Sequence, residues 1–347
     1  MFERLRNWRA QREDHEGVPL KYRLLWLLLV LPALALYVLS YFWDVDQAYF
    51  KTPRIEVITA ARARTGGASE VQMTPGSVTT STLIEVASFL IDKPGGYLTN
   101  DVTPPGILMD NTQSWEFGVV VQMRDLTRLL RNDFSRSQTQ SSDDPDLALA
   151  DPHFHNDTEG WLFPSYEGQV QAGLDALERY LRRLQQTDDA EFFARADNLA
   201  EWLALVARRL GDQSQRLSAS VGRETVNVDL SGDSSAPVPV RSIRGARTPY
   251  MEIDNVFFEA RGATWAILHF MRAIAVDFKL VLEDKNAMVS VRNILRNLRE
   301  TQNTLGSPVI LNGTGFAVFA NHSLVMASYI ARANTAIIDL IKLLQQG

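Results

Sequence analysis

Leu24 to Trp43 reads LLWLLLVLPALALYVLSYFW, a run of twenty residues without a charged side chain. An α-helix of this length spans roughly 30 Å, which is the thickness of the hydrocarbon layer of a bilayer. The run separates a short head, residues 1–23, from a long following part, residues 44–347. The sequence therefore predicts a single N-terminal transmembrane helix over residues 24–43.

The charges on either side of this run predict its orientation. The head carries six basic residues, of which Lys21 and Arg23 stand directly beside the run, whereas Asp44 opens the far side. Lysine and arginine stay on the cytoplasmic side of a membrane. We therefore expect a cytoplasmic basic head, residues 1–23, and an exported part, residues 44–347.

A cleaved signal peptide is the alternative interpretation of the same run. Ala33-Leu34-Ala35 has the small-residue pattern of a cleavage site after an apolar segment. The apolar residues continue for eight positions beyond Ala35, which favours an uncleaved anchor. The chain contains no cysteine, so neither a lipoprotein anchor nor a disulfide is expected.

Charge also bears on the expected partners. The chain has a net charge of −6, and the acidic excess lies after the apolar run. An acidic domain repels nucleic acid, so nucleic acid is not an expected partner. The bilayer, through residues 24–43, and a protein of the cell envelope are the partners that we expect.

Helical periodicity dominates residues 77–347. Apolar side chains recur at three- and four-residue spacing over approximately residues 79–92, 114–134, 165–186, 189–217, 248–282, 284–303 and 321–345. This pattern predicts an all-α class, most simply a bundle of about seven helices. The segments 165–186 and 189–217 are predicted to form an antiparallel helical hairpin.

Three segments lack this periodicity. Residues 44–76 are predicted to be a juxtamembrane connector with one short strand, Arg54 to Ile58. Residues 136–151 are rich in Ser, Gln and Asp, which predicts a solvated linker or loop and a subdomain break. Residues 221–246 fit either a β-hairpin, the minor β element of the fold, or a flexible crossover.

The segment Asp151 to Glu159 offers the best candidate for chemistry. His153, His155 and Asp157 alternate along it, and in an extended chain these side chains would point to one side. Imidazole and carboxylate ligands suit zinc or copper. The alternative is a polar loop before the next helix, and this alternative is favoured, so no cofactor is expected.

Apolar side chains in two loop-like segments are candidates for contact with a partner. Trp161 and Phe163 precede a proline and are expected to pack onto the core, with a platform for a partner segment or a glycan as the alternative. Phe316 and Phe319 lie in the apolar, glycine-containing stretch of residues 307–319, for which burial is also favoured over an exposed contact.

Residues 248–282 are apolar on nearly every face, which is typical of the central buried helix of a bundle. His269 within them is expected to be a hydrogen-bonded core histidine. A cavity near Trp265 that holds a lipid or another hydrophobe is the alternative.

The arrangement of the whole chain resembles the proteobacterial family called domain of unknown function 2333. The resemblance rests on the short basic head, the span ending in Tyr41-Phe42-Trp43-Asp44, the segment Gly160 to Ser165 and the apolar helical C-terminus. It implies a Gram-negative inner-membrane protein that faces the periplasm, and it carries over no catalytic residue.

We expect from these features a non-enzymatic interaction or scaffold component of the bacterial cell envelope, anchored by one span with a periplasmic helical domain over residues 77–347. No Gly-x-Ser-x-Gly, P-loop or His-Glu-x-x-His motif is present. A metal-dependent periplasmic hydrolase at His153, His155 and Asp157 is the first alternative, and a protein that binds lipids or other hydrophobes is the second.

Overall fold

The computed structural model describes residues 20–43, 55–66, 73–136, 142–186, 189–221, 248–307, 309–313 and 319–346. Within these ranges the regular structure is helical, and the only β pairing is an isolated antiparallel bridge between Asn312 and Asn321. The predicted all-α class is confirmed for this part of the chain. The β-hairpin or crossover predicted near residues 221–246 falls almost wholly outside the described residues.

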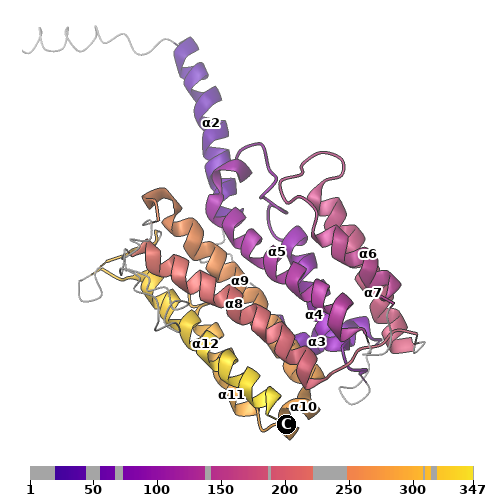
Figure 1. Cartoon of the computed structure of the whole chain (residues 1–347). Helices are drawn as coiled ribbons and strands as arrows, with labels where there is room; N and C mark the ends of the chain where they lie inside the picture. Colours follow the sequence, from indigo (N-terminus) through magenta and orange to yellow (C-terminus); the bar gives the residue numbers. More distant parts are fainter. Residues whose placement is uncertain are drawn as a thin grey trace, which may run out of the picture.

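Figure 1 shows a bundle of long helices from one end of which α2 projects. The α-helices are α2 (Leu20–Trp43), α3 (Val57–Arg64), α4 (Ser77–Asp92), α5 (Asp110–Leu129), α6 (Pro145–Phe154), α7 (Tyr166–Gln186), α8 (Ala196–Ser220), α9 (Ile253–Asp277), α10 (Lys279–Asp284), α11 (Met288–Glu300) and α12 (His322–Gln345). Short helical turns η2 (Gly106–Leu108) and η5 (Tyr250–Glu252) precede α5 and α9, and the π-helical turn η3 (Leu130–Phe134) extends α5.

Helix α9 is the centre of the bundle, as its sequence predicts. It packs most extensively against α5 and also contacts α4, α8 and α11. His269 on α9 is buried, where its Nδ1 donates to the Trp265 carbonyl oxygen at 2.8 Å and its Nε2 accepts from the Ile55 N–H at 3.1 Å. The prediction of a hydrogen-bonded core histidine is confirmed.

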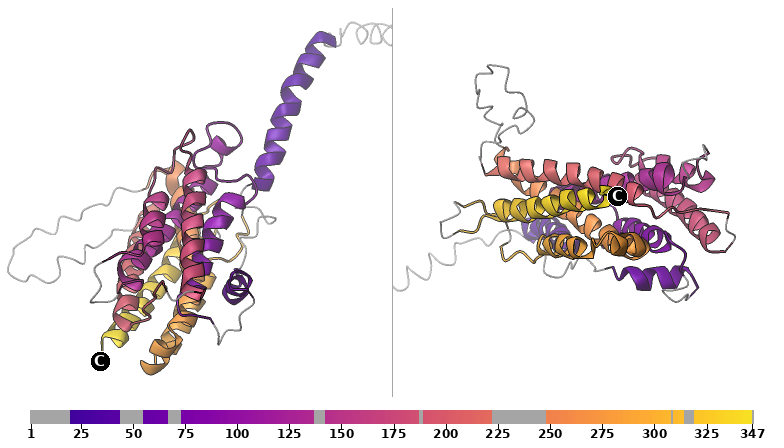
Figure 2. Two further views of the ribbon diagram at one scale, coloured as in Figure 1. Left: turned by 90° about the vertical axis from the view of Figure 1, so that its right-hand side faces the viewer. Right: turned by 60° about the horizontal axis from the view of Figure 1, so that its bottom comes forward.

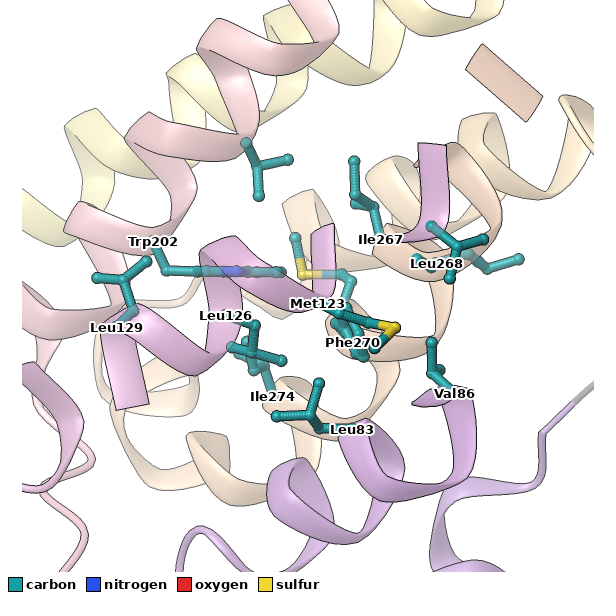
Figure 3. Close-up of a cluster of buried hydrophobic side chains, with 14 of the residues drawn as sticks. Leu83, Val86, Met123, Leu126, Leu129, Trp202, Ile267, Leu268, Phe270 and Ile274 are labelled. Atoms are coloured by element: carbon teal, nitrogen blue, oxygen red, sulfur yellow. The ribbon is translucent and has the colours of Figure 1, made fainter. Parts of the chain in front are cut away.

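Two glycines allow α5 and α9 to touch through their backbones. A methyl group on Gly262 would lie 2.0 Å from the Trp115 carbonyl oxygen, and one on Gly118 would lie 2.1 Å from the Glu259 carbonyl oxygen. The core then closes around this crossing (Figure 3), with side chains from α4, α5, α8 and α9 meeting between the helices.

The outer helices correct one prediction. Helix α7 packs mainly against α6 and α4, whereas α8 lies along α12 (Figures 1 and 2), so α7 and α8 are not the predicted helical hairpin. The residues between them form hydrogen bonds with the end of α5 instead: the Phe193 N–H donates to the Phe134 carbonyl oxygen at 2.7 Å. This attachment directs α8 toward the other side of the bundle.

The strand predicted at Arg54 to Ile58 is also wrong, because helix α3 begins at Val57. Val57 and Ala61, one helical turn apart, are buried against Val78 of α4 and Ala273 of α9. Tertiary packing on one face of α3 therefore overrides the β-propensity of the two branched residues at its start.

The linker predicted over residues 136–151 is wrong from Asp144 onward, where α6 begins. The Asp144 carboxylate accepts from the N–H groups of Asp146 and Leu147, and Pro145 occupies the first helical position, which is a strong helix start. Arg183 of α7 lies 2.7 Å from the Asp144 carboxylate. The polar composition thus reflects ion pairing, and the hydrophobic core continues from Phe134 across this segment to Leu147.

Among the described residues, α12 is the helix that is long and apolar enough to cross a membrane by composition, while the described apolar part of α2, Leu24–Ser40, is shorter. The predicted N-terminal span is therefore not established by the structure. Helix α12 buries one face against α8 and α11, which makes it a core helix of the bundle.

Candidate functional site

Two loops meet at the end of the bundle from which α2 projects (Figure 1). One comprises residues 93–109 between α4 and α5, and the other comprises residues 155–165 between α6 and α7. The end of α2 contacts the first loop directly: Gly95 has a φ of +86°, and a methyl group on it would lie 2.7 Å from the Trp43 ring. The two loops and the end of α2 therefore form one region of the molecule.

A buried ion pair fixes the first loop. The Lys93 ammonium lies 2.5 Å from the Glu116 carboxylate of α5, and both side chains are fully buried. Glu116 also accepts from the N–H groups of Leu98 and Thr99, at 2.9 and 2.8 Å, and from the Thr99 hydroxyl at 2.6 Å. Burial raises the pKa of Glu116, while Lys93 and the hydrogen bonds from Thr99 and Leu98 oppose this rise. Breaking a buried ion pair by removing one partner is strongly destabilising, so the contacts of Glu116 support this part of the loop.

Further hydrogen bonds join the two loops. The Asn100 amide donates to the Gly160 carbonyl oxygen at 3.0 Å and to the Glu167 carboxylate at 2.8 Å. Beneath them, the rings of Tyr97 and Tyr166 are buried with centroids 4.8 Å apart. The loops are consequently a single supported unit on top of the core.

The two loops expose several large apolar side chains. Six apolar residues of the loops are exposed, and we call them the loop-end surface: Val102, Ile107, Leu108, Trp161, Leu162 and Phe163. Phe163 is fully exposed, and 73% of Leu108 is exposed. An apolar cluster of this kind on a supported loop typically marks a contact site.

The expectation that Trp161 and Phe163 pack onto the core is therefore wrong. The space beneath their loop is already filled by Tyr97 and Tyr166, neither of which leaves appreciable surface exposed. Both side chains are exposed, and the alternative, a platform for a partner, stays a prediction. Sequence reasoning missed Val102, Ile107 and Leu108 altogether, although an Ile-Leu pair directly after Pro-Pro-Gly was a detectable signal, since turn residues are usually polar.

The structure does not bring His153, His155 and Asp157 together as ligands. His153 Nδ1 lies 2.8 Å from the Gln169 amide oxygen, while His155 lies between the Asp151 carboxylate, at 2.9 Å, and the Arg128 guanidinium, at 2.6 Å from Nε2. Asp157 accepts from the Glu159 N–H in a turn. No group of three metal-binding side chains is found in the described part of the chain. The segment is helical through Phe154, so the extended-chain alternation on which the metal prediction rested does not apply.

The second pair of candidate contact residues lies between α11 and α12. Phe319 and Val309 are exposed, whereas Phe316 lies outside the described residues. Two backbone hydrogen bonds, from Gly313 N–H to the Ala320 carbonyl oxygen and from His322 N–H to the Leu311 carbonyl oxygen, hold the ends of this segment together. Burial, the favoured expectation, is wrong for Val309 and Phe319.

The surroundings of Trp265 are packed with rings. Its ring centroid lies 5.2 Å from that of Trp115 and 5.5 Å from that of Phe89, and the tilted ring of His269 lies beside it with a centroid distance of 4.8 Å. A cavity of about 200 Å³ exists elsewhere, between the start of α12 and the end of α11, and is lined by polar as well as apolar residues. The space that a hydrophobe would need at Trp265 is occupied by side chains.

The comparisons with known proteins give one match. Neither the curated proteins nor the solved structures yield a similar protein. The model of a family described as an uncharacterized protein conserved in bacteria matches residues 17–347, which is nearly the whole chain and includes α2, the loops and the bundle. The chain therefore belongs to the bacterial family named domain of unknown function 2333.

Proposed function

We propose that this protein is a single-pass component of the bacterial inner membrane, anchored by α2, whose helical bundle faces the periplasm and binds another envelope component without catalysing a reaction. The observation that carries the proposal is the environment of α2. Every residue from Leu24 to Leu39 is exposed, so an apolar helix presents all of its faces to the surroundings.

Water is a poor environment for such a helix. Nine of its residues between Leu24 and Leu39 are leucines, and insertion of a central leucine into a bilayer is favourable by roughly 0.5 kcal/mol. The leucines alone therefore favour insertion by about 5 kcal/mol. Pro32 lies inside the helix, which is tolerated in membrane-spanning helices.

The orientation follows from the flanking charges. Basic residues lie before the apolar run of α2, up to Lys21 and Arg23 in its first turn, whereas Asp44 and Asp46 follow the helix. By the positive-inside rule the head is cytoplasmic and the bundle is exported. Anchoring concentrates the bundle near membrane partners, which favours an interaction role.

The exposed pair Val309 and Phe319 is the candidate contact for a protein partner. Val309 precedes, and Phe319 lies within, the stretch whose ends are joined by the hydrogen bonds between Leu311 and His322 and between Gly313 and Ala320. Exposed apolar side chains beside such fixed backbone provide contact area at a low cost in conformational entropy.

The topology can be tested with single cysteines, because the chain has none of its own. In cells with a permeabilised outer membrane, a membrane-impermeant maleimide should label Leu280→Cys at the far end of the bundle. It should label Gln11→Cys in the head only after the inner membrane is disrupted. Equal labelling of both positions while the inner membrane is still intact would contradict the anchored topology.

The interaction role requires purification of the full-length tagged chain in mild detergent. We expect a stoichiometric companion protein that is lost in the double variant Val309→Ser, Phe319→Ser. The matched control is Leu280→Ser, Val289→Ser, which removes two equally exposed apolar side chains from α10 and α11. Recovery of a lone chain from native membranes would contradict the scaffold role.

A further inference from the structure

We propose that the loop-end surface lies in the outer interface of the membrane that α2 crosses, so that the bundle is held against the bilayer at two places. This inference rests on the proposed anchoring by α2. It assigns Trp161 and Phe163 to lipid and leaves the Val309 and Phe319 segment as the contact for a protein.

Position is the first argument. Trp43, the last residue of α2, packs on Gly95, and the loop that contains Gly95 also carries Val102, Ile107 and Leu108. Figures 1 and 2 both show the loops of this end of the bundle beside the lower end of α2. An aromatic residue at the end of a span sits at the level of the lipid headgroups. The loop-end surface is therefore brought to the same depth.

Side-chain chemistry is the second argument. Tryptophan and other amphipathic aromatic residues favour the membrane interface, and leucine and phenylalanine insert below it. Four of the six residues of the loop-end surface are of these types, and Trp161, Leu162 and Phe163 are consecutive in the chain. The buried Lys93–Glu116 pair and the bonds of Asn100 hold both loops in place, so no ordering of the chain is needed before contact.

Charge distinguishes the kind of lipid contact. Lys93 is the only lysine or arginine in residues 93–109 and 155–165, and its side chain is enclosed by Glu116. The charged carboxylates of the two loops include Asp101, Asp157 and Glu159. The arginines nearest to the loops, Arg124 and Arg128 of α5, are engaged by the carbonyl oxygens of Phe154 and Asn156 and by His155. The contact must therefore be apolar, and anionic headgroups should not strengthen it.

A protein partner is the less suitable occupant for this surface. The span ends beside the same loop, so a partner would have to fit between the bundle and the membrane. Lipid already occupies that space when α2 is inserted. The proximity of Trp43 to the loop thus favours the bilayer itself.

The test uses the full-length chain in liposomes of zwitterionic phosphatidylcholine that contain a nitroxide-labelled lipid. An environment-sensitive fluorophore is attached in turn to Phe163→Cys, Leu280→Cys and Leu28→Cys, which is straightforward because no native cysteine competes. We expect blue-shifted emission and several-fold stronger quenching at position 163 than at position 280. Addition of anionic lipid should leave this difference unchanged.

The three positions separate the two proposals. Equal emission and quenching at positions 163 and 280 would overturn the inference, and if position 28 is quenched in that case, the anchor stands. Quenching at position 163 without quenching at position 28 would support the surface contact and contradict the span. If neither position 163 nor position 28 is quenched, both proposals fail.

A second variant guards against a label that creates its own affinity for lipid. With the fluorophore on Ile107→Cys, the substitutions Leu162→Asp and Phe163→Asp should abolish most of the quenching. Thermal unfolding of the bundle should be unchanged, because both side chains are exposed. Undiminished quenching at position 107 would show that the two loops do not act as one surface and would overturn the inference. A second copy of the chain is the other possible occupant. It would be indicated if the label at position 163 were quenched little by the labelled lipid but its emission shifted to the blue as the protein-to-lipid ratio rose. That result would also overturn the inference.

Discussion

Helices α2 and α12 are each 24 residues long and predominantly apolar, yet the molecule surrounds them in opposite ways. Helix α2 exposes every residue from Leu24 to Leu39. Helix α12 buries one regular face, made of Ser323, Met326, Ala327, Ile330, Ala333, Ala336, Ile337, Leu340 and Leu344. Its outer face carries Arg332, Asp339 and Lys342.

The difference shows that average apolarity does not assign a helix to lipid or to protein. What matters is how the apolar residues are distributed around the axis. In α12 the charged residues share one side, which leaves a stripe for α8 and α11. In α2 no side is polar between Leu24 and Leu39, and this distribution is the reason for the proposal that a bilayer surrounds the helix.

Ile330→Asp should have the largest effect, and it tests whether α12 is a core helix of the bundle. Ile330 is fully buried, so the substitution places an unpaired carboxylate in the core and leaves a cavity. We expect a loss of more than about 4 kcal/mol in the free energy of unfolding. Circular dichroism during thermal unfolding should show no cooperative transition, while the chain remains in the membrane fraction through α2. A preserved transition would contradict the core assignment of α12.

Leu28→Arg tests the α2 side. A charge at the centre of a span costs roughly 3 kcal/mol on insertion scales. We expect a lower fraction of chain resistant to alkaline carbonate extraction, with an unchanged midpoint for unfolding of the bundle. Leu280→Arg, at another exposed leucine, is the control and should not alter extraction. If both variants extract equally, α2 does not anchor the chain.

Gly262→Ala tests the close packing of the bundle, which α2 lacks. Its new methyl group would meet the Trp115 carbonyl oxygen at 2.0 Å, and the backbones of α5 and α9 would have to separate. We expect about 3 kcal/mol of destabilisation in denaturant unfolding. Gly306→Ala is the matched control, since nothing lies within 4 Å of its added methyl group. A similar loss in both variants would show that the close crossing is not the cause.

The stability of the bundle should depend on pH, whereas α2 has no acidic or basic side chain between Leu24 and Leu39 that could titrate. Asp277 accepts from the Thr79 N–H and hydroxyl at the start of α4, at 2.7 and 2.6 Å. Burial of its carboxyl group raises its pKa from 3.8 to about 6. The folded state therefore binds the proton more tightly, and the contribution of Asp277 to stability falls as the pH rises from 3.8 through about 6.

Between pH 4.5 and 6 this decline amounts to about 1.5 kcal/mol. Asp277→Asn, which retains an oxygen for Thr79, should remove that part of the slope in denaturant unfolding measured across this range. An identical slope in the variant and the unaltered protein would assign the decline to other groups, such as Glu116.

Ile338→Arg should have the smallest effect. Ile338 lies on the exposed face of α12 in water, where a surface substitution changes stability by less than about 0.5 kcal/mol. If α12 crossed a membrane, the same change would cost about 3 kcal/mol and alter carbonate extraction. An effect on extraction would therefore reverse the comparison of the two helices.

The sequence was most informative where local patterns are long. The period of 3.6 residues over residues 79–92 and 321–345 gave α4 and α12 nearly to their ends, and the all-round apolarity of residues 248–282 gave the central helix. It misled where partners come from elsewhere. The polar composition of residues 136–151 predicted a solvated segment, because no local pattern pairs Asp144 or Asp146 with a basic residue. In the structure Arg179 and Arg183 of α7 form ion pairs with them.

The candidate site was predictable only in part. The sequence indicated Trp161 and Phe163 as candidate contact residues but favoured their burial, whereas Tyr97 and Tyr166 fill the core beneath them and leave both exposed. The remaining residues of the loop-end surface lie about sixty positions earlier in the chain. A bond such as that between Asn100 and Gly160 brings the two loops together, and no local pattern indicates it.

The sequence by itself thus determined the all-α class, the central helix and the family, because helical periodicity and residue order are local properties of the chain. Only the tertiary structure decided which apolar residues are enclosed. Burial depends on what arrives from distant segments, so α12 is covered by α8 and α11, whereas α2 and the loop-end surface are covered by no described segment. Both proposals rest on this contrast between apolar surface that other helices bury and apolar surface that stays exposed.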